Sequence, residues 1–248
     1  MITCEVCVDS VEGALAAQSA RAQRIELCDN LVEGGTTPSL GMIQLARRSV
    51  DIDINVIIRP RGGDFYYSDL EMEVMRLDIL AAKAAGANGV VIGLLTPDGR
   101  VDMKKTRALV TVAHPMSVTF HRAFDLSRDP GESLEAICAL QIERILTSGQ
   151  MPSALEGATC IASLVEKARG NPIIMAGGGI NEHNAAAIVA LTGVKEIHFA
   201  ARKPINSPMI HRNLRCQMGK PYLPDEYIRK ETSPERILTI LHAVREQA

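Results

Sequence analysis

Eight short apolar runs, each followed by a pattern typical of a helix, constrain the fold of this chain more than any other feature. The runs cover residues 1–8, 24–28, 55–59, 90–95, 116–121, 143–147, 172–176 and 196–200. Runs of this length, bounded by Gly, Pro or charged residues, predict buried strands. Strands that alternate with helices predict an α/β fold with a parallel sheet, and eight regular units favour a closed (β/α)8 TIM-type barrel. An open, doubly wound sheet is the competing arrangement.

Capping residues mark the expected helix boundaries. Ser10, Ser153 and Asn181 are expected N-caps, Asp102 is expected to begin a helix, and Pro38 and Pro130 are expected at first helical positions. A long helix is expected over residues 68–85 and a final amphipathic helix over residues 235–247. Residues 202–231 contain four prolines and no helical period, which predicts a long loop before the last helix. No linker interrupts the pattern, so residues 1–248 are expected to form a single domain.

Composition excludes several classes of partner. Hydrophobic residues make up 46% of the chain, but aromatic residues make up only 3%, so the core must be aliphatic. The formal net charge is −2 and no basic stripe is present, so a nucleic-acid partner is not expected. No run resembles a signal peptide or reaches transmembrane length, which predicts a soluble cytoplasmic protein. The six scattered cysteines are therefore expected to be reduced thiols.

The third apolar run leads directly into charged residues. Arg59, Arg61 and Asp64 lie with two glycines after the expected strand. This places them at the carboxyl edge of the sheet, where α/β barrels bind their ligands. Buried charges are costly without partners. The group is thus either part of a ligand site or a structural ion-pair network that closes the barrel rim.

The first two runs both end in Glu-x-Cys. Because side chains alternate along a strand, Glu5 and Cys7 share one face of the first strand, and Glu26 and Cys28 share one face of the second. Neighbouring strands would bring the two thiols within a few ångström at the barrel mouth. Two thiolates suit a soft ion of low coordination number, Cu(I) above all, whereas no Cys/His cluster at zinc spacing supplies four zinc ligands. The alternative is that both cysteines are small buried hydrophobic residues.

A second group of polar residues is expected at the same end of the barrel. Thr119 and His121 share one face at the end of the fifth strand. Together with Glu5, Glu26 and Arg59, His121 would form a mouth suited to general acid–base chemistry. The same residues would also satisfy one another as an internal charge network.

Glycines follow the sixth and seventh strands. Gly149 ends the first of these turns, and Gly177, Gly178 and Gly179 follow the seventh strand just before a helix. Barrels often bind phosphate through backbone N–H groups in this region, so the three glycines are a candidate anion site. A plain tight turn is the alternative.

Seven motifs together resemble the copper homeostasis protein CutC family, and the strand 1 and 2 motifs resemble its animal cytosolic members most. They are EVCVDS at 5–10, RIELC at 24–28, EGGTTPS at 33–39, RPRGGDF at 59–65, FHRAFD at 120–125, LTSG at 146–149 and AGGGI at 176–180. The resemblance implies a TIM-type barrel, a cytoplasmic location, self-association into dimers or tetramers, and a role in copper handling. It also implies Cu(I) ligands at the positions of Cys7 and Cys28. One departure is Ala200, where the family tends to carry serine in a His-x-Ser-Ala-Arg run.

Two functions therefore follow from the sequence, and a purely oligomeric scaffold is the third alternative. In the first, Cys7 and Cys28 bind Cu(I), and the polar residues of the mouth set charge and access around the ion. In the second, the protein is a barrel enzyme that acts on a small anionic substrate, with or without a phosphate group. Its catalytic candidates are Glu5, Glu26, Arg59, Asp64 and His121, with Gly177, Gly178 and Gly179 at the anion.

Overall fold

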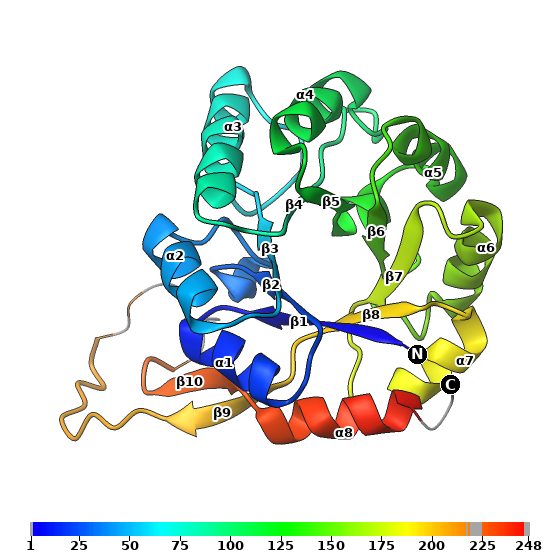
Figure 1. Ribbon diagram of the computed structural model, residues 1–248. Helices are drawn as coiled ribbons and strands as arrows, with labels where there is room; N and C mark the ends of the chain where they lie inside the picture. The colour runs from blue at the N-terminus through cyan, green and yellow to red at the C-terminus, as the bar shows by residue number, and fades with distance from the viewer. Residues whose placement is uncertain (1, 217, 219–224, 246–248) are drawn as a thin grey trace.

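The computed structural model confirms the predicted barrel. It describes residues 2–216, 218 and 225–245. Eight parallel strands close into a ring, in which β1 pairs with both β2 and β8 (Figure 1). The strands are β1 (Thr3–Val8), β2 (Arg24–Leu27), β3 (Asp53–Ile57), β4 (Gly89–Ile92), β5 (Ser117–Phe120), β6 (Arg144–Thr147), β7 (Ile173–Gly177) and β8 (Glu196–Phe199).

Helices surround the ring on its outside (Figure 1). They are α1 (Val11–Ser19), α2 (Leu40–Ser49), α3 (Asp69–Ala84), α4 (Met103–Ala113), α5 (Pro130–Ala139), α6 (Ala158–Ala168), α7 (Ala185–Thr192) and α8 (Pro234–Arg245). Two short 3₁₀ helices, η1 (Leu31–Glu33) and η2 (Arg122–Leu126), follow β2 and β5. Aliphatic side chains fill the layer between strands and helices, as the low aromatic content predicts.

Several helix starts are as predicted, and three are not. Ser10 and Asp102 are N-caps whose side chains accept backbone N–H bonds, and Pro130 opens α5. The prediction at Pro38 is wrong, because the side chain of Ser39 caps α2, which begins at Leu40. The helices expected at Ser153 and Asn181 begin later, after Gly157 and Asn184. Turns with their own side-chain hydrogen bonds occupy the intervening residues, and such turns compete with helix starts.

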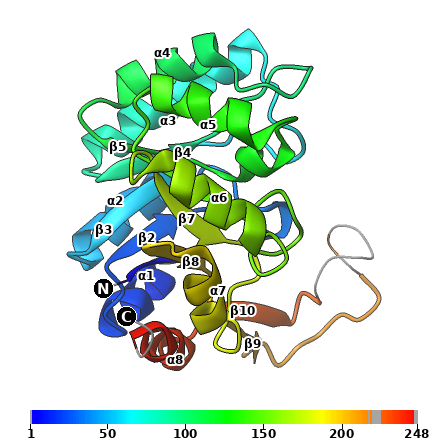
Figure 2. The same ribbon diagram turned by 90° about the vertical axis from the view of Figure 1, so that its right-hand side faces the viewer.

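The segment predicted as one long loop, residues 202–231, is partly regular. Its two ends pair as the antiparallel strands β9 (Arg202–Asn206) and β10 (Ile228–Thr232). We call the described residues between 202 and 232 the arm, since they extend away from the barrel wall (Figure 2). After the arm, α8 packs against α1 and α7. The predicted end of this last helix, residues 246–247, lies outside the described residues.

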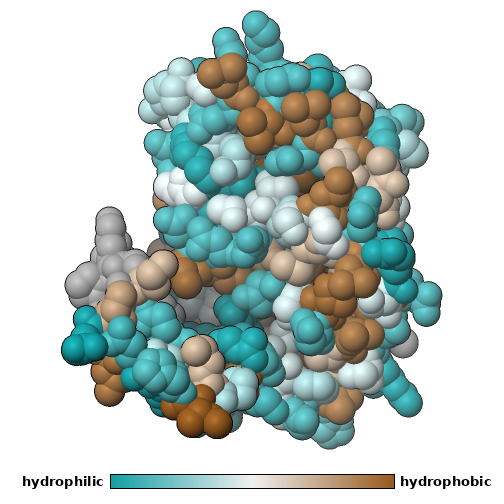
Figure 3. Space-filling model, turned by 90° about the vertical axis from the view of Figure 1, so that its left-hand side faces the viewer, coloured by the Kyte–Doolittle hydropathy of each residue, from teal (hydrophilic) through white to brown (hydrophobic). Residues whose placement is uncertain are grey.

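Exposed apolar side chains occur on several elements, and two groups of them are used below. Leu70, Val74 and Leu77 form a stripe along α3 at helical spacing, and Ile210 and Leu214 are exposed in the arm. Figure 3 shows the face that carries α2 and α3, where hydrophobic residues gather above the arm. Within the described residues, no helix is long and apolar enough to cross a membrane.

Candidate metal and ligand site at the barrel mouth

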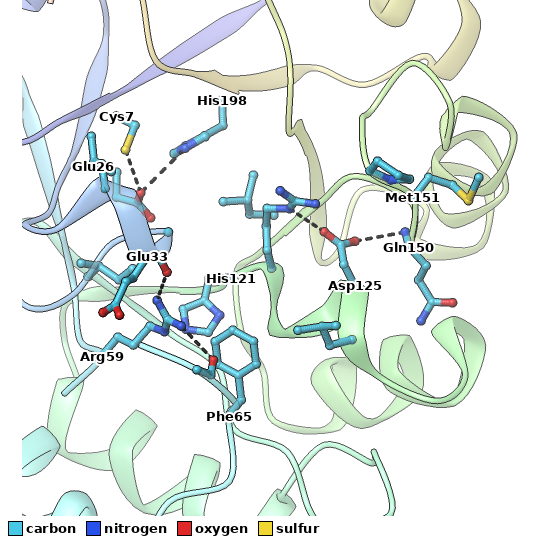
Figure 4. A pocket seen from close by; sticks show the side chains of 18 residues that line it. Cys7, Glu26, Glu33, Arg59, Phe65, His121, Asp125, Gln150, Met151 and His198 are labelled. Carbon is cyan, nitrogen blue, oxygen red and sulfur yellow. Dashed lines mark hydrogen bonds and ion pairs between the residues drawn. The ribbon is translucent and has the colours of Figure 1, made fainter. Parts of the chain in front are cut away.

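A cavity of about 610 Å³ opens at the carboxyl ends of the strands. Figure 4 shows three groups of polar side chains around it, from different elements. Cys7, Glu26 and His198 come from β1, β2 and β8, Arg59 and His121 follow β3 and β5, and Asp125 belongs to η2. This is the edge at which TIM barrels place their functional residues.

The thiols of Cys7 and Cys28 lie side by side, as the alternation of the two strands predicts. Their Sγ atoms are 3.2 Å apart. Cys7 lines the cavity and is 5% exposed, whereas Cys28 is fully buried and also donates to the carbonyl of Val8 at 3.3 Å. The hydrogen bond between the thiols and burial raise the pKa of Cys7 well above its usual value. The pKa of Cys28 is also raised, because burial and the charge of Glu26 outweigh the hydrogen bond between the two thiols.

His198 is a site residue that the sequence reasoning missed. Its Nε2 lies 3.7 Å from Oε2 of Glu26, and Cys7 donates to the same oxygen at 3.5 Å (Figure 4). Burial opposes the charged imidazolium, but Glu26, Cys7 and Glu5 outweigh it and raise the pKa of His198 well above its usual value. Burial also raises the pKa of Glu26. The available signal was alternation, since His198 faces the barrel interior two residues after Glu196.

Glu5 lies below the cavity, in the barrel interior, and does not line it. Its carboxylate accepts hydrogen bonds from Arg24 at 2.5 Å, Asn55 at 3.1 Å and Nδ1 of His198 at 2.8 Å. Burial alone would raise the pKa of Glu5, but His198 and Arg24 lower it to about 2. Arg24 also pairs with Glu196, so Glu5 belongs to a buried charge network that supports the site from beneath.

Arg59 and His121 lie together on another part of the cavity wall. The Arg59 guanidinium donates to the carbonyls of Glu33, Gly35 and Gly63 at 2.7–2.9 Å, and it stacks on Phe65 with 5.0 Å to the ring centroid. Among the described residues, no carboxylate forms an ion pair with it, and its Nε has no hydrogen-bond partner.

His121 is buried against the same phenylalanine, with the two ring centroids 5.0 Å apart. Burial and the charge of Arg59 lower the pKa of His121 to about 3, so its imidazole is neutral. Nδ1 accepts the N–H of Ala123, which places the proton on Nε2, an atom with no partner in the described part of the chain.

Two other predicted groups do not reach the cavity. Asp64 pairs with Arg61 at 3.0 Å on the surface, and Arg61 also pairs with Glu71 of α3. This favours the structural interpretation of the Arg61–Asp64 pair, because short loop contacts satisfy both groups outside the mouth. Thr119 is buried in β5 and is likewise not a lining residue.

The glycines after β7 lie beside the cavity rather than in its wall. Gly178 is close to Arg122 and Ser148, and its carbonyl accepts the N–H of Ala154. Arg122, which lines the cavity, is held by Asp125 at 2.7 Å and by the Ser148 hydroxyl at 2.7 Å. The candidate anion site at Gly177, Gly178 and Gly179 therefore stays a prediction. Arg122, the cavity-lining cation close to Gly178, already forms an ion pair with Asp125.

Comparisons with known proteins agree with the fold. The CutC family model matches residues 2–203. The chain is 48% identical to a copper homeostasis protein cutC homolog of Mus musculus over 236 residues, which cover 95% of this chain and 87% of that protein. It is 47% identical to a CutC family protein of Chromobacterium violaceum over 240 residues, 97% of each chain.

A comparison with solved structures also finds a CutC protein. A CutC structure from Streptococcus agalactiae superposes with a TM-score of 0.77 at 37% identity, covering 80% of this chain and 98% of that one. Phosphoribosyl anthranilate isomerase from Thermotoga maritima superposes with a TM-score of 0.59 at 12% identity, covering 99% and 100% of the two chains. The second likeness concerns the barrel fold alone.

Proposed function

The chain belongs to the CutC family, and from that premise we propose that it is a copper-handling protein that binds Cu(I) through Cys7 and Cys28. The observation that carries the proposal is the 3.2 Å separation of the two Sγ atoms, of which that of Cys7 belongs to a residue lining the cavity. Sulfurs this close can both contact one ion with small side-chain movements. Thiolates are the protein ligands that Cu(I) prefers, and two of them satisfy an ion that accepts low coordination.

The surroundings of the thiols support this proposal. Cys28 is shielded from solvent and Cys7 nearly so, which protects a bound Cu(I) ion from water. Glu26 and His198 would set the charge next to the ion. Copper is the cargo in this proposal, and the charge network under Glu5 keeps the site in place whether or not copper is bound.

An anaerobic Cu(I) titration against a competing chelator tests the proposal. The wild-type protein is expected to bind one tight equivalent, and Cys7→Ser/Cys28→Ser is expected to lose it while its circular dichroism is unchanged. Cys138→Ser/Cys160→Ser is the matched control, because it removes two thiols away from the cavity. Unchanged Cu(I) uptake by Cys7→Ser/Cys28→Ser would refute the assignment of these two cysteines as ligands.

We also propose a cytoplasmic location and a homo-oligomer, a dimer or tetramer. The described cysteines are all unpaired thiols, as is usual in reducing compartments. The apolar stripe of α3 and the exposed apolar residues of the arm are surfaces of the kind that protein contacts cover.

A second candidate function is supported by the size of the cavity. A space of about 610 Å³ is far larger than an ion needs and falls in the range of small-molecule sites. A barrel enzyme acting on a small anion would use Arg59 as the cation and His121 as a neutral hydrogen-bond donor. Equilibrium dialysis of metal-free protein with small carboxylates and inorganic phosphate tests this candidate, and loss of binding in His121→Asn is the expected result.

A further inference from the structure

Three residues of the cavity wall carry three different metal-ligand atoms. The Sγ of Cys7, a carboxylate oxygen of Glu26 and a ring nitrogen of His198 all lie within 4.8 Å of one another. We propose that Cys7, Glu26 and His198 form a site for a divalent ion of the zinc type, with a free coordination position that faces the cavity. The proposal does not depend on copper binding, although the two sites share Cys7.

Two of the three separations between the donor atoms match those around zinc, and the third, between Cys7 and His198, is within 4.8 Å. With bonds of 2.0–2.3 Å to N, O and S, the donors of a tetrahedral site lie about 3.3–3.7 Å apart. The Sγ of Cys7 lies 3.5 Å from Oε2 of Glu26, and Nε2 of His198 lies 3.7 Å from the same oxygen. An ion can therefore enter between these atoms without displacement of the strands that carry them.

The chemistry of the donors favours a divalent ion at this site. Imidazole, thiolate and carboxylate together suit zinc, whereas a carboxylate is a poor ligand for Cu(I). Spacing along the chain could not reveal the site, because its ligands come from three strands that are adjacent only after β1 pairs with β2 and β8.

Glu5 supplies the support that such a site needs. Its Oε1 lies 2.8 Å from Nδ1 of His198, which leaves Nε2 directed at Glu26 and Cys7. Arg24 and Asn55 fix the Glu5 carboxylate from the other side. Carboxylate–imidazole–metal relays of this kind orient the ligand histidine and raise its basicity, so Glu5 is a positioning residue here.

The remaining coordination position opens into the cavity. Cys7, Glu26 and His198 all line it, whereas the fully buried Cys28 does not. Three protein ligands beside an open space are the arrangement of zinc sites that accept an external ligand, while closed structural sites use four. Water or a small anion from the cavity would complete the site. Because Cys7 belongs to both donor sets, Cu(I) and the divalent ion exclude each other.

Cobalt titration of the full-length, metal-free protein tests the inference, since Co²⁺ reports on zinc-type sites through its colour. One equivalent is expected to bind with a charge-transfer band from one thiolate, and Zn²⁺ is expected to displace it. Glu26→Gln, which preserves size, should weaken Co²⁺ binding at least about tenfold and weaken Cu(I) binding much less, because Glu26 is a ligand only of the divalent ion in this proposal.

Cys28→Ser is the matched variant and should do the reverse, weakening Cu(I) while the Co²⁺ band and affinity stay the same. His198→Gln, with folding checked by circular dichroism, should also lose Co²⁺. A band from two thiolates that halves in Cys28→Ser, or Co²⁺ binding unaffected by both Glu26→Gln and His198→Gln, would overturn the inference. Failure of Cu(I) binding in the wild type would refute the copper proposal and leave the cobalt result standing.

Discussion

The Glu5 carboxylate is fully buried, and every partner that compensates its charge is a side chain of the barrel interior. Arg24 bridges it to Glu196, and Glu196 in turn pairs with Arg144 at 2.7 Å. Such a chain of buried charges contributes little net stability compared with an apolar core, but loss of one member leaves the others uncompensated. The interior of this barrel is therefore stabilised as a connected unit.

Replacing Glu5 by Gln is expected to destabilise the protein by about 3 kcal/mol, because Arg24 and His198 each lose a charged partner in a buried place. Urea unfolding at pH 7 measures the change. Glu135→Gln, on the exposed side of α5, is the control and should change stability by less than about 0.5 kcal/mol. Equal stabilities of the two variants would show that the network does not constrain the fold.

The neutral imidazole of His121 makes stability depend on pH. Its pKa is about 3 in the folded protein against about 6.5 when unfolded, so its contribution is complete above pH 6.5 and declines as pH falls toward 3. From pH 7 to pH 5 the expected loss is about 2 kcal/mol. His198, whose pKa is raised, acts in the opposite direction and stabilises as pH falls.

Comparison of variants isolates this contribution. Urea unfolding of wild type and His121→Asn at pH 7 and pH 5 should show a smaller acid loss in the variant, whose amide can still accept the N–H of Ala123. His183→Asn, at an exposed position, serves as the control. The same acid loss in all three proteins would contradict the assignment.

Strand alternation was sufficient to predict the pairing of Cys7 with Cys28, because both residues end strands whose neighbours are fixed by chain order. Alternation does not show how far along the barrel axis a side chain lies. The expectation of Glu5 at the mouth is therefore wrong, because Glu5 lies beneath the cavity. His198 was overlooked because its partners are distant in sequence. Asp64 was misplaced because a loop residue has no periodicity to show where it points.

At the scale of elements, α3 shows how local chemistry sets a boundary. The Ser68 hydroxyl accepts the Glu71 N–H at 3.3 Å, and the Glu71 carboxylate accepts the Ser68 N–H at 2.7 Å. This capping box satisfies two backbone donors at the helix start. It also fixes the end of the loop that carries Arg59 and Phe65 into the cavity wall.

Ser68→Ala removes half of this capping box and is expected to cost about 1 kcal/mol. For a protein of this size the melting temperature should fall by about 2–4 °C. Differential scanning calorimetry measures the shift. Ser49→Ala, whose hydroxyl only bonds within α2, is the control and should melt close to the wild type. A fall of equal size in the control would remove the capping explanation.

Local signals explain which elements could be predicted. Capped helices such as α3 and α4 have side chains that satisfy their first N–H groups, so their starts are visible in the sequence. Strands β9 and β10 have no such signal, since they are charged, exposed and interrupted by Pro204. Each of these strands pairs with the other across the arm, and no alternation of apolar residues predicts this pairing.

At the scale of the molecule, closure of the sheet by β1 and β8 leaves no free edge in the barrel, so contacts with other copies must use helices or loops, the arm among them.

In the arm, Ile210 is 100% exposed, and Leu214 is also exposed. If the proposed oligomer uses the arm, Ile210→Gln/Leu214→Gln should lower the mass seen in sedimentation velocity. Leu191→Gln, an exposed position on α7, should not. An unchanged mass in the arm variant would show that the arm is not the contact surface, and the α3 stripe would be the next surface to test.

If Cys7 and Cys28 bind Cu(I) as proposed, the burial of Cys28 behind the cavity wall limits how the ion can be exchanged. An ion must pass through the cavity and meet Cys7 before it reaches Cys28, since Cys7 alone of the two lines the open space. A second protein would exchange the ion only through a segment small enough to enter the cavity of about 610 Å³. The size of the copper carrier would therefore set the rate of delivery and release.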